Sequence, residues 1–210
     1  IQDWLILGPY LGAGSAPGEA SIKADWLRNA DGSIVQETVT PVAGDTVATD
    51  FIQDPPLGTE TAASTGIVSN ATLNPGGVPT WFAWSDPDDT IDHDEALGVG
   101  QDNMMVYHVT YVNLPAEVVD AQVALASADS VEVLVDGDSI GFHNGGRGYG
   151  GKFNIQNRFA AGTLAAGGHM IMVKVFDGGG GSGFRLRLED STGAYLDNYE
   201  VCLDPAGTTC

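Results

Sequence analysis

The chain has 210 residues, of which 43% are hydrophobic, and it contains 29 glycines and 10 prolines. This length accommodates one large domain or two small ones, and so many turn-forming residues favour short strands over long helices. Eight Lys and Arg residues stand against 28 Asp and Glu residues, which gives a formal net charge of −20. A field of this sign repels nucleic acids and anionic membranes, so we exclude both as main partners.

The first part of the chain offers one short strand and one short helix. Residues 4–10 form an apolar run that stops at Gly8 and Pro9, and residues 18–30 are the only segment with a helical pattern. No apolar run in the sequence reaches the roughly 18 residues that a membrane-spanning helix needs. We therefore expect no membrane insertion.

Residues 79–95 combine two tryptophans with a run of acids. Trp81 and Trp84 lie three positions apart, so in a strand they point to opposite faces, one toward the core and the other, taken as Trp84, toward a sugar ring. The acids suit calcium, which takes six to eight oxygen ligands, although the EF-hand glycine and terminal glutamate are missing. A solvated acidic loop is the alternative. The candidate calcium ligands are Asp86, Asp88, Asp92 and Asp94.

The second half of the chain shows a two-residue period in successive short runs. Residues 104–112 are apolar on both faces, which is typical of a central strand, and Asp136-Gly137 predicts a tight hairpin. Such runs separated by turns are typical of an antiparallel β-sandwich. We predict one all-β domain over residues 1–210, in which residues 104–190 are the most recognisable part. The other runs lie at residues 119–127, 130–140, 169–176 and 184–190.

A glycine-rich loop, "GFHNGGRGYGGKFN", spans residues 141–154. Glycines let a backbone approach a partner closely, and aromatic rings beside hydrogen-bond donors are suited to binding sugars. The alternative is an exposed crossover whose rings only pack on the sandwich. The candidate ligand-binding residues in this loop are Phe142, His143, Asn144, Arg147, Tyr149 and Lys152.

The glycine run at residues 177–183 is interpreted as the tip of a hairpin. A phosphate loop requires a helix after its glycines, whereas residues 184–188 have the period of a strand. Because glycines also admit a partner, Asp177 at the start of this run is a further candidate ligand-binding residue.

Three of the eight cations, Lys174, Arg185 and Arg187, are predicted to share the outer face of this hairpin. In that position they would either meet an anionic sugar or pair with neighbouring acids such as Glu132.

The two cysteines, Cys202 and Cys210, lie in the segment "CLDPAGTTC". Their spacing and the lack of a nearby histidine make a poor metal site, so we predict a disulfide that pins residues 200–210. Since disulfides persist in oxidising compartments, we expect a secreted protein.

Several of these segments resemble a known family. The run "ASADSVEVLVDGDSI", the glycine-rich loop after it and "AAGTLAAGGHMIMVKVFDGGGGSGFRLRLED" resemble the galactose-binding-like β-sandwich, a jelly-roll module appended to many secreted bacterial glycoside hydrolases. The opening "DWLILGPY" is similar to a segment found upstream of such modules. The resemblance implies non-catalytic binding of a polysaccharide or oligosaccharide, with a calcium ion in many members.

A looser likeness is to PA14-type sugar-binding domains. Those domains carry two adjacent aspartates before the strand equivalent to "VEVLVDG", and the pair holds calcium and sugar. The corresponding residues here are Ala128 and Asp129, so one of the two carboxylates is replaced.

The predicted function is therefore carbohydrate binding by a secreted module, with calcium as its cofactor. No GxSxG or HExxH pattern and no catalytic Cys with a partner His is recognisable, so we expect no stand-alone enzyme, although the chain would suit an accessory module of a glycoside hydrolase. The alternative function is a self-associating jelly-roll subunit of a surface layer, filament or capsid.

Overall fold

The structure is a computed structural model that describes residues 1–11, 22–28, 33–47, 66–67, 79–98, 100, 102–149 and 154–210. Nearly all of its regular elements are strands. In chain order they are β1 (Asp3–Leu11), β2 (Gly66–Ile67), β3 (Phe82–Ser85), β4 (Ile91–Asp92), α2 (His93–Leu97), β5 (Met104–Leu114), β6 (Val118–Ala128), β7 (Ser130–Val135), β8 (Asp138–His143), β9 (Asn157–Leu164), β10 (Gly167–Asp177), β11 (Gly183–Glu189) and β12 (Glu200–Cys202).

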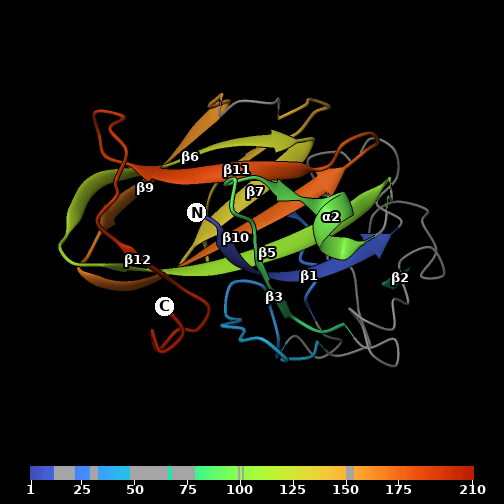
Figure 1. Cartoon of the computed structure of the whole chain (residues 1–210), viewed down its shortest axis with the longest axis horizontal. Coiled ribbons are helices and arrows are strands. Elements are labelled where there is room, and N and C mark those ends of the chain that lie inside the picture. The colour runs from blue at the N-terminus through green and yellow to red at the C-terminus, as the bar shows by residue number, and fades with distance from the viewer. Residues whose placement is uncertain are drawn as a thin grey trace.

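These strands form two antiparallel sheets (Figure 1). The larger sheet has the order β2-β1-β5-β10-β7-β8, with β3 paired to β1 and β12 paired to β5. The smaller sheet has the order β4-β11-β6-β9. The predicted all-β antiparallel sandwich is confirmed.

One apolar cluster lies between the sheets. Ile6, Val106 and Val173 of the larger sheet are buried together with Leu125 and Phe184 of the smaller one. The alternating side chains of each strand explain this arrangement, because every second residue points toward the opposite sheet.

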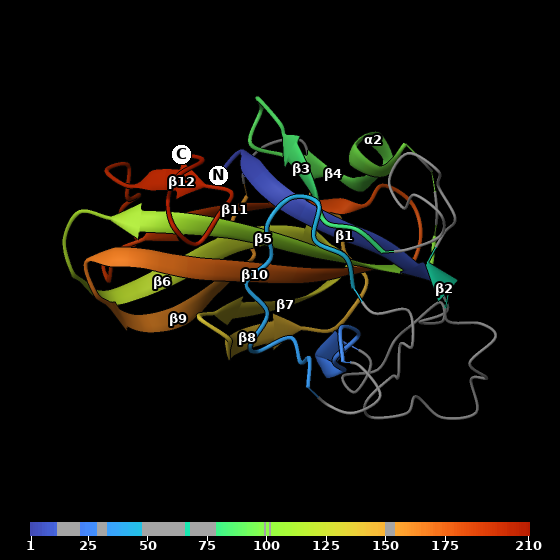
Figure 2. The same ribbon diagram turned by 90° about the horizontal axis from the view of Figure 1, so that it is seen from below.

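A second apolar cluster covers the outer face of the larger sheet, where residues 22–28 and 33–47 lie across the strands. Trp26 packs in this cluster with Tyr107 and Met172, and its backbone N–H donates to the Tyr107 hydroxyl at 2.9 Å. Figure 2 shows the segment of residues 33–47, in cyan, crossing the strands of this sheet. Strand β5 is therefore buried on both faces, as predicted for residues 104–112.

The turn prediction at Asp136-Gly137 is confirmed. These two residues join β7 to its antiparallel neighbour β8, and both have positive φ values, 51° and 89°. A two-residue hairpin loop with positive φ at both positions matches the twist of the strands it connects, which is why Asp-Gly is favoured there.

The hairpin predicted around residues 177–183 is wrong. Strand β10 pairs with β5 and β7, whereas β11 pairs with β4 and β6, so the glycine run crosses from one sheet to the other. A two-residue period identifies both flanking strands, but it is the same whether they pair with each other or lie in opposite sheets.

The shared outer face predicted for Lys174, Arg185 and Arg187 is also wrong. Lys174 lies in the larger sheet and is fully buried, whereas both arginines lie in β11 of the smaller sheet. Lys174 Nζ lies 2.6 Å from Glu132 Oε2, so the alternative of pairing with this acid is confirmed. The outward face of β10 is covered by residues 22–28 and 33–47, which the alternation along β10 does not reveal.

Helical structure is sparse in the described residues. Of the helix predicted over residues 18–30, residues 22–28 contain only two helical positions, Ile22 and Lys23. The short helix α2 lies instead in the acidic segment. Over the described ranges, no helix has the length and apolar character needed to cross a membrane.

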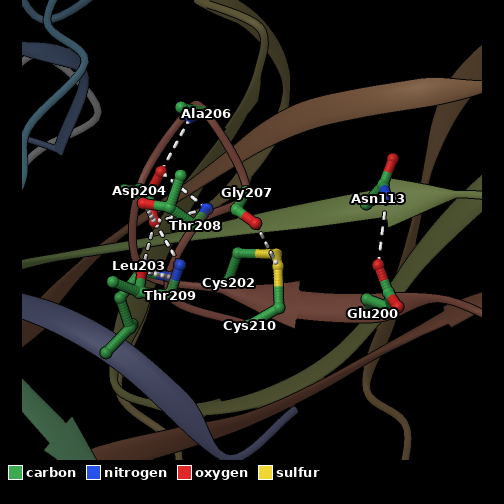
Figure 3. The surroundings of a disulfide bond; sticks show 10 residues. All are labelled: Asn113, Glu200, Cys202, Leu203, Asp204, Ala206, Gly207, Thr208, Thr209 and Cys210. Carbon is green, nitrogen blue, oxygen red and sulfur yellow. Dashed lines mark hydrogen bonds between the residues drawn. A yellow bond between two sulfur atoms is a disulfide. The ribbon is translucent and has the colours of Figure 1, made fainter.

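The predicted disulfide between Cys202 and Cys210 is present (Figure 3). Asp204 organises the loop that it closes, since its carboxylate accepts the backbone N–H groups of Ala206 at 2.9 Å and Thr209 at 2.6 Å. The Thr209 hydroxyl and the backbone N–H groups of Thr208 and Thr209, which bond to its charged form, lower the pKa of Asp204 to about 2.

Candidate functional site

Loops from distant parts of the sequence meet at one end of the sandwich. The β6–β7, β8–β9 and β10–β11 connections lie there because antiparallel strands return to the same edge, and α2 lies at this end as well (Figure 1). We call this end the loop rim. It contains a cavity of about 540 Å³, called here the rim cavity. Its lining residues are Asp86, Asp88, Thr90, Asp92, Glu95, Gly148, Tyr149, Gly181 and Arg185.

The acidic wall of the rim cavity is built by turns. The backbone N–H of Asp88 donates to Asp86 Oδ1 at 3.0 Å, and the N–H of Thr90 donates to Asp88 Oδ1 at 2.9 Å. Asp92 caps the N-terminus of α2 by accepting the N–H of Glu95 at 3.2 Å. Aspartate side chains favour such turns and caps, which explains their position between β3 and α2.

Tyr149 and Arg185 also line the cavity, and both contact the acidic segment. The Tyr149 hydroxyl donates to Asp92 Oδ2 at 3.4 Å, and the Arg185 guanidinium lies 5.9 Å from the centre of the Tyr149 ring. Arg185 Nε donates to Thr90 Oγ1 at 2.6 Å. Burial and the Asp92 carboxylate raise the pKa of Tyr149 to about 12, so the hydroxyl stays protonated.

A corner of the rim beside the cavity is organised by Asp129. Its two carboxylate oxygens accept the backbone N–H groups of Arg147 at 2.7 Å and Gly178 at 2.9 Å, so this side chain joins the β8–β9 and β10–β11 loops. Arg147 Nη2 donates to Ser127 Oγ at 2.7 Å. Burial lowers the pKa of Arg147 to about 10, which still leaves the guanidinium charged at neutral pH.

Asp177 lies at the base of the glycine run and is 1% exposed. Its Oδ1 accepts the N–H of Gly179 at 3.2 Å, while Oδ2 is buried and receives no hydrogen bond from the described residues. Burial raises the pKa of Asp177 to about 6, and the charges of Asp129, Asp102 and Asp94 add to this effect. A buried carboxylate oxygen without a donor is costly unless it is protonated or neutralised.

A buried polar chain supports the rim from below. Ser182 Oγ lies 2.5 Å from His93 Nδ1, and His93 Nε2 lies 3.0 Å from His108 Nε2. All three residues are fully buried. The chain connects the glycine run and α2 to the central strand β5.

The predicted ligand-binding residues are divided between the rim and other places. Tyr149 lines the cavity, and Arg147 and Asp177 lie in the adjoining corner. Asn144 Oδ1 accepts the Ser130 hydroxyl at 3.3 Å near this corner, while half-buried His143 lies beside Arg147, and burial lowers its pKa.

Three predicted residues fall outside this constellation. Phe142 packs on the apolar cluster of the outer face, with Lys23 Nζ 3.8 Å from its ring centre. Trp84 is half-buried against the core between the sheets, opposite in direction to fully packed Trp81. Lys152 lies outside the described residues.

The four predicted calcium ligands do not form a common set. Asp86, Asp88 and Asp92 line the cavity, but each gives an oxygen to a backbone N–H of its own segment. Asp94 is exposed and is not part of the lining, and partial desolvation together with the charges of Asp92 and Asp102 raises its pKa. Within the described ranges, no three His, Cys, Asp or Glu side chains are close enough to hold a metal ion.

Sequence reasoning missed several residues of the rim. Thr90 and Glu95 lie within the acidic run at residues 86–95, so their closeness in sequence to the chosen aspartates could have identified them. Asp129 was noticed only through the aspartate pair that it partly retains, and its bonds to two loops follow from the fold alone.

Comparisons with known proteins give only weak likenesses. No family model matches the chain, and no curated protein matches it. Among solved structures, a PA14 sugar-binding domain from an RTX adhesin is similar at 19% identity and a TM-score of 0.43, with 96% of each chain covered. The PA14 domain of the antifreeze protein MpAFP is similar at 16% identity and a TM-score of 0.37, with 98% of this chain and 92% of that chain covered.

An anti-sigma factor domain-containing protein is similar at 14% identity and a TM-score of 0.41, over 66% of this chain and 44% of that chain. All three TM-scores are below 0.5.

Proposed function

We propose that the protein binds carbohydrate without chemical conversion, at the rim cavity. The observation that supports this proposal is the convergence of an aromatic ring, a guanidinium and four carboxylates around about 540 Å³ of space. Sugar rings stack on aromatic faces, while their hydroxyl groups donate to carboxylates and accept from guanidinium N–H groups. Gly148 and Gly181 leave the backbone of two loops accessible to such a ligand.

The charge of the cavity favours a neutral saccharide over an anionic one. Four lining carboxylates face a single guanidinium, that of Arg185. The other cations once considered for an anionic sugar are engaged elsewhere: Lys174 is buried with Glu132, and Arg187 pairs with Glu189. The lining therefore offers mainly hydrogen-bond acceptors, which suit the hydroxyl donors of a neutral saccharide.

The test is the affinity of the purified protein for neutral polysaccharides, measured by affinity electrophoresis and titration calorimetry. Replacing Tyr149 by Ala removes the ring and should weaken binding by about tenfold, the equivalent of about 1.4 kcal/mol. Tyr195→Ala is the matched control, because Tyr195 also lies near an arginine, 6.0 Å from Arg187, but is 53% exposed and outside the cavity.

If no polysaccharide of a broad panel retards the protein in the gel, carbohydrate binding is refuted. Regular assemblies in micrographs of the same material would then favour the alternative of a structural subunit. Release of soluble products from a polysaccharide would instead identify an enzyme.

We further propose that calcium stabilises the rim beside Asp177. Its Oδ2 is buried and receives no hydrogen bond from the described residues, and hard cations prefer such oxygen ligands. Since no three acidic side chains of the described ranges meet there, backbone carbonyls and water would complete the coordination. A chelator should lower the melting temperature of the native protein and have no effect on Asp177→Asn. Asp190→Asn is the control, since the Asp190 carboxylate is occupied by the N–H groups of its own turn. An unchanged melting temperature would remove calcium and leave the carbohydrate proposal standing.

A further inference from the structure

Four polar side chains from separate segments meet inside the apolar cluster on the outer face of the larger sheet. Lys174 comes from β10, Glu132 from β7, Tyr107 from β5, and Gln36 from the segment that covers this face. Each is at most 3% exposed. Such a group is costly to bury, so its geometry requires an explanation.

The contacts place an amine beside a carboxamide and a carboxylate. Lys174 Nζ lies 2.6 Å from Glu132 Oε2 and 3.1 Å from Gln36 Oε1, and it also donates to the Ala24 carbonyl at 2.7 Å. The Tyr107 hydroxyl donates to the same Gln36 oxygen at 3.0 Å. The carboxamide carbon of Gln36 is one covalent bond beyond that oxygen.

We propose that this cluster is a self-modification site, at which Lys174 and Gln36 become joined by an isopeptide bond with release of ammonia. The nucleophile is the Lys174 amine, and the electrophile is the Gln36 carboxamide carbon. Glu132 is the proton carrier, and the Tyr107 hydroxyl is positioned to stabilise the charge that develops on the carboxamide oxygen.

The step balances without an external reagent. Glu132 takes a proton from the Lys174 ammonium, and the nitrogen lone pair forms a bond to the Gln36 carbon, so that the carbonyl electron pair moves to the oxygen. When the carbonyl re-forms, the bond between this carbon and Gln36 Nε2 breaks. The leaving nitrogen takes one proton from Glu132 and departs as ammonia, while Glu132 receives the remaining proton of the attacking nitrogen.

Two features of the surroundings favour this step. Burial lowers the pKa of Lys174, which makes the neutral amine accessible, although Glu132 opposes this effect. The product replaces a buried ion pair by a neutral amide and leaves Glu132 as a neutral acid. The new bond would tie together residues 138 positions apart, fixing the covering segment to the sheet.

The test is the intact mass of the purified, reduced protein, followed by peptide sequencing in a mass spectrometer. We expect a mass lower than that of the sequence by one ammonia molecule, and a branched tryptic peptide that contains both Gln36 and Lys174. Glu132→Gln, which keeps the side-chain shape but removes the proton carrier, should restore the full mass. Glu189→Gln is the control for loss of a buried glutamate elsewhere and should keep the ammonia loss.

Two results would overturn the inference. One is a native protein of full sequence mass, and the other is an ammonia loss without the branched peptide. Circular dichroism of both variants checks that they fold, but the native mass decides the question by itself. This outcome is independent of whether the rim cavity binds sugar.

Discussion

Acid should destabilise the sandwich through two neutral histidines buried beneath the loop rim. His108 Nδ1 lies 3.2 Å from the Val173 carbonyl, which only accepts, so this nitrogen carries the proton. His108 Nε2 must then accept from His93 Nε2–H, and His93 Nδ1 accepts from the Ser182 hydroxyl. The chain is complete only when both rings are neutral.

The magnitude follows from the pKa values. Burial lowers the pKa of His93 to about 3 and that of His108 well below 6.5. Between pH 6.5 and about 3 the unfolded chain therefore binds protons that the folded chain does not, and the free energy of unfolding falls as the pH falls. Each pH unit below 6.5 costs about 1.4 kcal/mol for a histidine that stays neutral in the folded state, so at pH 4.5 His93 costs about 2.7 kcal/mol and His108 adds to this cost. That is a substantial part of the stability of a typical domain, about 5–15 kcal/mol.

The assay is urea unfolding at several pH values between 7.5 and 4.5, compared between the native protein and His108→Gln. Removing one histidine should reduce the slope of the free energy of unfolding against pH by up to about 1.4 kcal/mol per pH unit below pH 6.5. His169→Gln is the control, because Asp136 beside it helps to raise its pKa, so it is protonated in both states across the acid range. Asp177 has a raised pKa, so its protonation stabilises the folded state as the pH falls, opposite to the effect of the histidines. This contribution is the same in the native protein and in the variant, so the comparison between them isolates the effect of the histidine. Equal slopes for the native protein and His108→Gln would refute the reasoning.

Three further outcomes test how the rim and the tail are held. Gly183→Ala should abolish saccharide binding and lower the melting temperature, since its Cβ would lie about 2.0 Å from the Ile91 carbonyl oxygen in β4. Gly180→Ala, also at positive φ but in open space, should cost only about 1 kcal/mol in thermal unfolding and keep binding. Reducing the Cys202–Cys210 disulfide should lower the stability by about 2.5 kcal/mol in denaturant unfolding. Asp204→Asn should speed amide hydrogen exchange in this loop, and unchanged exchange would contradict the role of its carboxylate.

The sequence specified local structure well and long-range contacts poorly. The two-residue period located the strands, Asp136-Gly137 located a hairpin, and the cysteine spacing located the disulfide. Each of these depends on residues close together in the chain. The sheet to which a strand belongs depends instead on partners far away, which is why the glycine run was assigned to a hairpin although it crosses between sheets.

For the side chain of Lys174, too, the local sequence pattern did not predict the long-range contacts. Its alternation with Val173 and Val175 correctly places it away from the core between the sheets. Whether that outward face meets water depends on Gln36 and its neighbours, which are 138 positions away and carry no repeating pattern. The pattern thus determined the direction of the side chain but not what covers it.

The segments of the candidate site could be predicted from local sequence, but their meeting in space could not. The acidic run and the glycine-rich loops could be selected separately, because their compositions are unusual. Their meeting in one cavity depends on the order of the strands, which returns the β8–β9 and β10–β11 loops to the end where β4 leads into α2. Counting carboxylates did not reveal how they are used for a related reason: Asp86, Asp88 and Asp92 each use an oxygen to close a turn or cap a helix. Among the candidate site residues, a buried oxygen without a hydrogen bond from the described residues belongs instead to Asp177, which lies outside the acidic run and was selected only because glycines follow it.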